Sequence, residues 1–401
     1  MVPHQSKRIW ISDTTLRDGE QAPGVVFSLQ EKRTIAEMLA EAGIDELEAG
    51  TPAMGRTERR AIEEVRDLNL PCRLTCWCRA VRRDIQLAAQ CGTGSIHISF
   101  PVSSIHLNSM KKNEARILEM LEAHVRIARR DFDRVSVGAQ DAMRANPDFL
   151  ETFIQQARSG GADRVRIADT VGIATPGAVF RIFDRLSRIS DIELEFHGHN
   201  DLGMATANAV AAAEAGADGL SVTINGLGER AGNAPLEEVS AALAFASGRN
   251  CNVRTTRLMG ICAYVAKASR RPIPVGKPIT GAGVFQHESG IHCDGLLKDP
   301  RTYEAFPSEA VGGGKTRFVI GKHSGTNIIR HILRKSGIAI GRDQAERLLE
   351  AVRTAAAVKG MSLSTEELLI LYDRTCRPES ALVGEWIAPE TERLPRHAEA
   401  V

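Results

Sequence analysis

Apolar and polar positions follow two alternating patterns along the first 250 residues. Short apolar runs typical of strands are each followed by a longer segment in which apolar residues recur every three to four positions, as on one face of a helix. The strand-like runs are Ile9–Asp13, Glu46–Ala49, Cys72–Trp77, Ser95–Phe100, Val135–Ala139, Arg164–Ala168, Glu193–His197 and Gly219–Ile224. The helical patterns that follow them are Ser28–Ala42, Thr57–Leu68, Arg82–Gln90, Asn113–Arg130, Pro147–Arg158, Pro176–Arg188, Met204–Ala215 and Leu236–Ala246.

This alternation predicts the fold class. Strands that alternate with helices form parallel sheets with helical crossovers. Eight such pairs within about 250 residues favour a closed (β/α)8 barrel, the TIM barrel, over an open doubly wound sheet. We therefore expect a catalytic barrel over residues 1–255.

The rhythm breaks after the barrel, where an appended and mainly helical region is predicted. We expect a linker or subdomain over 256–325, a helical subdomain over 326–385 and a flexible tail over 386–401. Glycines at 281, 283, 290 and 295 and the run 312–314 indicate loops and turns. Helices are predicted over 326–335 and 342–358, and Ser364 with Glu367 forms a capping-box pattern that opens a helix toward Cys376.

Composition excludes several classes of partner. Lys and Arg number 51 and Asp and Glu 50, so the chain lacks the basic excess of nucleic-acid or membrane-surface binders. No stretch approaches the roughly 18 to 20 apolar residues of a membrane span, and the N-terminus lacks a signal-peptide core. We expect a cytoplasmic protein.

Eight cysteines in such a chain are expected to be reduced thiols and not a disulfide framework. Cys72, Cys76 and Cys78 form the one tight cluster. A zinc site would need a fourth ligand, and no second CxxC pair is present. Small buried residues on an inner strand are therefore the favoured interpretation.

Polar side chains gather where the predicted strands end, which is the face of such a barrel that carries the chemistry. His197 and His199 lie two apart on an extended segment, so both imidazoles face the same way and could bind one ion. Asp18, after the first strand, is the natural third ligand, and Asn233, after the eighth, could supply an amide oxygen. The sequence therefore predicts a divalent metal site, without selecting Mg, Mn or Zn.

Two glycine-rich segments resemble nucleotide-binding motifs but do not fit them. Gly226–Ala231 matches G-x-G-x-x-G/A, yet it follows the last strand of the barrel and lacks a clean acidic partner. The segment Gly313–Thr316 ends like a P-loop, but Glu309 stands where the motif requires its first glycine.

Four segments resemble the motifs of the acyl-CoA Claisen-condensing family, which includes 2-isopropylmalate, homocitrate and citramalate synthases. They are DTTLRDGEQAPG (Asp13–Gly24), ADTVG (Ala168–Gly172), HGHNDLGMATAN (His197–Asn208) and NGLGERAGNA (Asn225–Ala234). Within the family, Cys76-Trp77-Cys78-Arg79, the segment Thr280–Lys298 and the short C-terminal part look closest to the NifV-type homocitrate synthases of nitrogen fixers. Lysine-pathway homocitrate synthases differ at Asp18 and Arg79.

The resemblance implies an acyltransferase that condenses acetyl-CoA with 2-oxoglutarate in a homodimer with shared active sites. It implies catalytic roles for Arg17 near the developing oxyanion, for His287 as the base on the acetyl group, for Tyr303 as an acid, and for Glu195 as an aid to the base. It also implies that substrate contacts come from Arg17, Gln21, Glu48, Arg79 and Thr170. Arg79 is the cation expected to meet the second carboxylate of 2-oxoglutarate.

Three alternatives stay open at this level. The motifs GERAGNA and GIHCDG also occur in 2-isopropylmalate synthases, and citramalate synthase is a second related activity. A lyase running the reverse cleavage is less favoured because of the long C-terminal extension. A non-catalytic metal- or CoA-binding barrel is disfavoured because every motif residue is retained.

Overall fold

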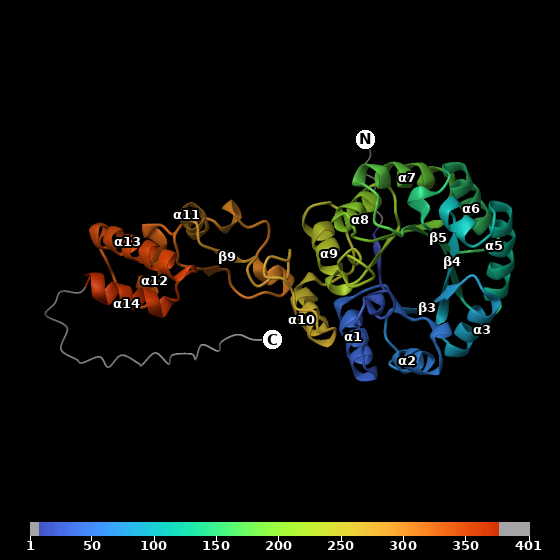
Figure 1. The fold of residues 1–401 in the computed structure, drawn as a ribbon, viewed down its shortest axis with the longest axis horizontal. Coiled ribbons are helices and arrows are strands. Elements are labelled where there is room, and N and C mark those ends of the chain that lie inside the picture. The colour runs from blue at the N-terminus through green and yellow to red at the C-terminus, as the bar shows by residue number, and fades with distance from the viewer. Residues whose placement is uncertain (1–7, 377–401) are drawn as a thin grey trace, which may run out of the picture. The chain divides into compact units, whose positions relative to one another are not determined.

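The computed structural model describes residues 8–376 and confirms a closed barrel of eight parallel strands (Figure 1). The strands are β1 (Trp10–Asp13), β2 (Glu46–Gly50), β3 (Arg73–Arg79), β4 (Gly94–Pro101), β5 (Arg134–Gln140), β6 (Arg164–Asp169), β7 (Glu193–Gly198) and β8 (Gly219–Val222). Each pairs with the next, and β8 closes the sheet on β1 with Trp10 opposite Gly219. The loops after these strands therefore meet at one end of the barrel.

Helices between the strands form the outer ring (Figure 1). They are α1 (Leu29–Ala42), α2 (Arg56–Arg66), α3 (Arg82–Cys91), α4 (Ser104–Ser109), α5 (Glu114–Ala128), α6 (Pro147–Ser159), α7 (Pro176–Ile189), α8 (Ala205–Glu214) and α9 (Leu236–Phe245), followed by α10 (Leu258–Ala268). Helix α1 shows how local signals set the bounds: Ser28 and Glu31 cap its start reciprocally, and Gly43 ends it at φ 87°. Its Ile35 and Leu39 are fully buried, each worth about 1.5–3 kcal/mol of hydrophobic stabilisation.

The described residues divide into two compact units. The barrel unit holds everything up to Phe285 together with Ala305–Thr316, and the second unit holds Gln286–Glu304 and everything from Arg317. The second unit contains β9 (Gln286–His287) paired in parallel with β10 (Arg317–Phe318), and the helices α11 (Gly290–Lys298), α12 (Thr326–Lys335), α13 (Arg342–Lys359) and α14 (Thr365–Cys376). The expected tail at 386–401 lies outside the described residues.

The second unit has its own small apolar core between α12, α13 and α14, which includes Ile329, Leu333, Leu348 and Val352. Ser364 and Glu367 form the predicted capping box, because the backbone N–H of each residue donates to the side chain of the other.

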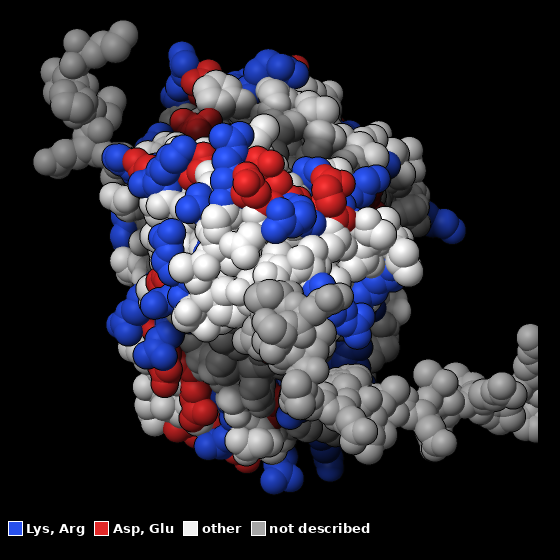
Figure 2. All heavy atoms as spheres, turned by 90° about the vertical axis from the view of Figure 1, so that its left-hand side faces the viewer, with Lys and Arg blue, Asp and Glu red and all other residues white. Residues whose placement is uncertain are grey.

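On the face seen in Figure 2, basic and acidic side chains lie intermixed. No helix among residues 8–376 is long and apolar enough to cross a membrane.

The expectation of a loop at Gly290 and Gly295 was wrong, because both lie in α11. A Cβ at Gly290 would lie 2.9 Å from the backbone nitrogen of Gly325, and one at Gly295 would lie 2.7 Å from the Tyr303 ring. These glycines allow close packing against neighbouring segments and do not mark turns.

Candidate active site

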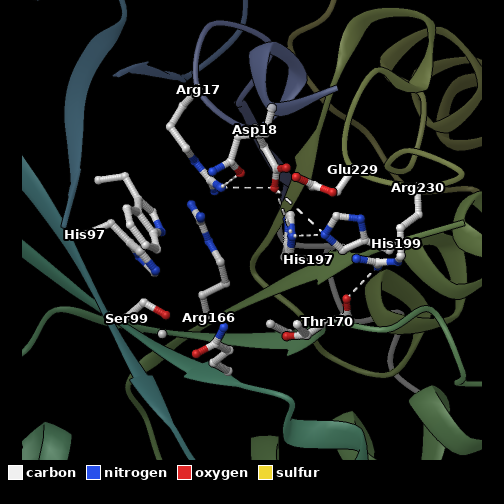
Figure 3. A pocket seen from close by; sticks show the side chains of 15 residues that line it. Arg17, Asp18, His97, Ser99, Arg166, Thr170, His197, His199, Glu229 and Arg230 are labelled. Atoms are coloured by element: carbon white, nitrogen blue, oxygen red, sulfur yellow. Dashed lines mark hydrogen bonds and ion pairs between the residues drawn. The ribbon is translucent and has the colours of Figure 1, made fainter. Parts of the chain in front are cut away.

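Three side chains that could hold a metal ion converge at the C-terminal end of the barrel (Figure 3). Asp18 Oδ2 lies 3.4 Å from His197 Nε2 and 3.9 Å from His199 Nε2. The two imidazole Nε2 atoms are 3.3 Å apart. The three ligand atoms all fall within 4.8 Å of one another, which is the spacing that one divalent cation between them requires.

The strand geometry explains why the two imidazoles meet. His197 is the penultimate residue of β7 and points into the barrel, where its Nδ1 lies 3.2 Å from Ser221 Oγ. His199 follows two residues later, after a glycine whose added Cβ would lie 2.7 Å from the Phe196 ring. A larger residue at 198 would displace Phe196 or the end of the strand, and with it both imidazoles.

Asn233, the fourth predicted ligand, lies in the loop after β8. It is fully buried, and its backbone pairs with that of His199 in an isolated antiparallel β-bridge. Its side-chain Nδ2 donates to Leu227 O at 2.9 Å. Its Oδ1 has no hydrogen-bond partner among the described residues. A buried amide oxygen without a partner is costly, and a metal ion beside it would remove that cost.

The glycines of the segment that resembles a dinucleotide motif, Gly226 and Gly228, shape this loop instead. A Cβ at Gly226 would lie 3.0 Å from Asn233 O, and one at Gly228 would lie 2.2 Å from Asn233 Nδ2. Both glycines have positive φ, 70° and 159°. The spacing therefore folds the loop tightly around Asn233.

Protonation states at the site suit metal binding. Burial lowers the pKa of His197 to about 3, with Asp18 opposing the shift, and burial also lowers the pKa of His199. Burial opposes ionisation of Asp18, but Arg17 and the two histidines outweigh it and hold the pKa of Asp18 below its usual value. Neutral imidazoles and an ionised carboxylate are the forms that bind a divalent cation.

Below the metal site, acidic and basic side chains alternate through the barrel interior. We call the set the buried charge ladder: Glu46, Arg164, Glu195, Arg166, Glu48, Arg17 and Asp18. Arg164 contacts Glu46 at 2.6 Å and Glu195 at 3.3 Å. Arg166 contacts Glu195 at 2.8 Å and Glu48 at 2.5 Å. Arg17 contacts Glu48 at 2.7 Å and Asp18 at 3.0 Å.

The ladder holds four carboxylates against three guanidiniums, and the exposed Arg73 supplies a fourth guanidinium at 3.3 Å from Glu46. A divalent cation at Asp18 would then leave net positive charge, which an anionic substrate could neutralise. The charge balance therefore fits a metal ion and an acid substrate together.

A cavity of about 230 Å³ opens above the ladder. Its lining includes Arg17, Asp18, His197, His199 and Arg166 (Figure 3). We call its uncharged part, which includes Trp77, His97, Ser99, Gly138 and Gln140, the uncharged wall; the Arg17 guanidinium lies over the Trp77 ring, 5.2 Å from the centroid. Burial holds the pKa of His97 well below its usual value, so this imidazole is neutral.

The structure brings several predicted residues to this cavity and leaves others outside its lining. Arg17, Gln21 and Thr170 line it, whereas Glu48 and Glu195 lie in the ladder and are fully buried. Burial raises the pKa of Glu195, although Arg164 and Arg166 oppose the shift.

Arg79 is held elsewhere. Its Nε lies 2.8 Å from Asp84 Oδ2, its side chain is 64% exposed, and it lines an adjoining cavity of about 420 Å³. The adjoining cavity shares Arg17, Gln21 and Trp77 with the first.

His287 and Tyr303 belong to the second unit. His287 lies in β9 and is half-buried; burial lowers its pKa, with Glu304 opposing. Tyr303 is 42% exposed and stacks on His292 with ring centroids 4.1 Å apart.

All eight cysteines are free thiols, and Cys72, Cys76 and Cys78 are buried on or beside β3, as the sequence suggested. Burial raises the pKa of Cys72 to about 11, which keeps the thiol protonated and unreactive.

Sequence reasoning placed Gln140 and Arg230 after strands at this end of the barrel, but it missed Trp77, His97, Ser99 and Arg166. A signal for some of them was present. His97 and Ser99 lie two apart on β4, and Arg164 and Arg166 lie two apart on β6, which is the spacing of inward-facing positions.

Comparisons with known proteins agree with this architecture. A family model described as HMGL-like matches residues 8–265, and one described as homocitrate synthase post-HMGL domain-like matches residues 279–360. The chain is 44% identical to 2-isopropylmalate synthase 2 of Caldanaerobacter subterraneus subsp. tengcongensis over 93% of this chain and 97% of that protein. It is 43% identical to homocitrate synthase 1 of Nostoc sp. over 91% and 97%. An HMG-CoA lyase structure from Bacillus subtilis shares the fold, with a TM-score of 0.61 at 18% identity, and the match covers 67% of this chain and 96% of the lyase.

Proposed function

The chain belongs to the HMGL-like family, and on that premise we propose that it is a homocitrate synthase that condenses acetyl-CoA with 2-oxoglutarate. The observation that carries the proposal is the convergence of Asp18, His197 and His199 above the buried charge ladder, with the unpartnered oxygen of Asn233 in the neighbouring loop. The second family match, over residues 279–360, favours the homocitrate branch of the family.

The reaction would join the acetyl methyl carbon to the ketone carbon of the oxo acid, after which water cleaves the thioester and releases CoA. A divalent cation held by Asp18, His197, His199 and Asn233 would supply Lewis-acid polarisation of the ketone. Arg17 lines the same cavity, and its guanidinium is placed to stabilise the oxygen on which negative charge develops.

We propose that Thr170 and Gln21 help to hold the carboxylate of the oxo acid. Thr170 Oγ1 accepts a hydrogen bond from Asp141 N at 2.9 Å, which leaves its own O–H free to donate into the cavity. Glu48 would act on the substrate indirectly, because it fixes the Nε of Arg17 at 2.7 Å.

The uncharged wall supports a substrate with a polar side chain. Ser99, Gln140 and the neutral His97 can hydrogen-bond a second carboxylate, whereas a branched alkyl group could make no use of these polar groups. Arg79 remains the proposed cation for this carboxylate, and it would exchange Asp84 for the substrate. Arg79→Ala should lower kcat/KM for 2-oxoglutarate while leaving that for pyruvate unchanged.

For removal of the acetyl proton we propose His287 as the base, with Tyr303 as the acid and Glu195 as a supporting carboxylate. We further propose a cytoplasmic homodimer with shared active sites and a product that serves nitrogenase cofactor synthesis. These proposals come from the family resemblance of HESGIHCDG and its surroundings.

The second candidate is 2-isopropylmalate synthase, which the 44% identity to a protein of that name favours; citramalate synthase is a third. The discriminating experiment measures CoA release with 2-oxoglutarate, 3-methyl-2-oxobutanoate and pyruvate, each against a blank without oxo acid. The protein is first stripped with chelator and then restored with Mg²⁺, Mn²⁺ or Zn²⁺. We expect metal-dependent release with preference for 2-oxoglutarate; a clear preference for another acid would overturn the substrate assignment.

A further inference from the structure

Arg230 connects three loops at the mouth of the barrel. Its Nε lies 2.7 Å from Asp201 Oδ1 and its Nη2 lies 3.1 Å from Asp201 Oδ2, in the loop after β7. The same Nη2 donates to Thr170 O at 2.7 Å, in the loop after β6. Arg230 itself stands in the loop after β8 (Figure 3).

Each of these loops carries a residue of the proposed site. Thr170 lies in the first, His199 in the second and Asn233 in the third. The guanidinium therefore joins three segments of the proposed site. Two of them carry the proposed metal ligands His199 and Asn233, and the third carries the proposed substrate contact Thr170.

The backbone of Arg230 is held in an unfavourable conformation. Its φ is 54°, in the left-handed region, which costs a residue with a side chain on the order of 1 kcal/mol. Such a conformation persists only where surrounding contacts fix it, and the three guanidinium contacts are of that kind.

Backbone hydrogen bonds fix the loop after β8 on both sides of Asn233, and the Arg230 side chain fixes the stretch that precedes them. Asn200 N donates to Gly232 O at 2.9 Å, and Ala234 N donates to Gly198 O at 3.1 Å, so the main chain is fixed on both sides of Asn233. The stretch Gly228–Ala231 precedes these bonds, and the Arg230 side chain fixes it to the loops after β6 and β7. The Leu227 carbonyl that orients the Asn233 amide is fixed separately by Thr223 Oγ1 at 2.7 Å, so loss of the guanidinium would free the Gly228–Ala231 stretch and its connection to the loop that carries His199.

We propose that Arg230 is a positioning residue for the metal site: it joins the loop after β8 to the loops after β6 and β7, and so holds the His199 imidazole in place at the mouth of the barrel. The inference rests on the proposed metal site. The ion pair with Asp201 is partly exposed, with side chains 43% and 24% accessible, so it contributes little to global stability. The effect of its loss should therefore appear in metal affinity and not in unfolding.

The test measures binding of Mn²⁺ and Zn²⁺ to the full chain by competition with a chromophoric chelator, without substrates. Arg230→Ala should weaken binding by roughly 10- to 100-fold, the usual range for residues that orient metal ligands. Co²⁺ absorption in the visible range should shift in the variant, because the ligand geometry changes. Arg230→Lys should recover little, since one ammonium cannot reach Asp201 and the Thr170 carbonyl with the same fork.

A matched control is Arg134→Ala. Arg134 also joins two barrel segments, through a 2.5 Å contact from β5 to Glu193 in β7 with 31% and 36% exposure, but at the N-terminal ends of the strands. It should leave metal affinity unchanged. Asp201→Ala should weaken binding by no more than Arg230→Ala, because the contact of Arg230 with the Thr170 carbonyl remains, and the double variant should be no worse than Arg230→Ala.

Equal affinity of the wild-type protein and Arg230→Ala for both metals, with unchanged Co²⁺ absorption, would overturn the positioning role alone. Failure of the wild-type protein to bind any of the three metals would overturn the proposed metal site itself. A loss of affinity in Arg134→Ala as large as that in Arg230→Ala would also contradict the inference, since the effect would then not depend on the mouth of the barrel.

Discussion

The barrel mouth and the second unit hold their chemically interesting side chains in opposite ways. In the barrel, Asp18, His197 and His199 are at most 6% exposed and their ligand atoms converge within 4.8 Å. In the second unit, His287 is half-buried and Tyr303 is 42% exposed and stacked on His292. A closed sheet brings together residues that lie far apart in the chain, whereas the second unit presents its residues on short elements and loops.

The two regions therefore differ in what supports a function for their residues. For the barrel residues, the fit to a metal ion and an anionic substrate follows from geometry. The proposed roles of His287 and Tyr303 rest on the family resemblance, and a variant of His287 tests them directly.

The largest expected effect is loss of a metal ligand. His199→Ala should abolish stoichiometric metal binding and lower condensation by roughly three orders of magnitude or more, because Lewis-acid polarisation supplies several kcal/mol and each 1.4 kcal/mol is tenfold. Metal content after gel filtration and CoA release measure the two effects. His124→Ala, at a histidine on α5 whose Nδ1 contacts Met120 O, is the control. Full metal content in His199→Ala would contradict the site.

The next effect tests the second unit. His287→Ala should lower kcat by about 10²- to 10⁴-fold, as expected for a general base, with metal affinity and unfolding free energy unchanged. Steady-state kinetics and metal titration provide the readouts, and His331→Ala on α12 is the control in the same unit. Activity within about twofold of wild type would remove His287 from the mechanism.

A third effect separates structure from catalysis in the barrel. Glu195→Gln should cost about 3–5 kcal/mol of unfolding free energy, because it leaves Arg164 and Arg166 buried with one carboxylate fewer. Urea unfolding measures it. Glu193→Gln, two residues earlier on β7 and partly exposed beside Arg134, should cost no more than about 1 kcal/mol. Unchanged stability of Glu195→Gln with lost activity would favour a direct catalytic role instead.

A further effect on stability concerns Asp13, at the end of β1. Burial raises its pKa from 3.8 to about 7, so between these values the folded form keeps a proton that the unfolded form has lost. The unfolding free energy should therefore fall as pH rises through this window, by at most about 1.4 kcal/mol per pH unit, and level off above it.

Asp13→Asn should remove this contribution. Its stability relative to wild type should rise between pH 4 and pH 7, measured by urea unfolding at several pH values. Asp67→Asn, at an exposed carboxylate after α2, should keep the wild-type profile. Identical profiles for wild type and Asp13→Asn would show that burial does not perturb this group.

Sequence predicted the barrel well because its signals are local. All eight strands were placed within a few residues, since each apolar run is bounded by turns and glycines, and the HxH spacing on β7 pointed to the metal site. The charge ladder could not be predicted in the same way. Arg164 meets Glu46 across 118 positions, and that contact depends on the register of a closed sheet.

Other features escaped for the same physical reason. Gly290 and Gly295 are typical of turns in a sequence, and the neighbours that require them to lack a side chain come from other segments of the chain. The pairing of Arg79 with Asp84 depends on side-chain directions at the start of α3, which sequence spacing does not determine.

The most direct test of the central claim is identification of the product. Metal-restored protein is incubated with 2-oxoglutarate and acetyl-CoA labelled with ¹³C in both acetyl carbons, and the mixture is analysed by mass spectrometry. We predict a tricarboxylic acid that carries both labelled carbons together with free CoA, and neither after chelation. Release of CoA with all label in acetate would contradict the account, because it would show thioester hydrolysis without carbon–carbon bond formation.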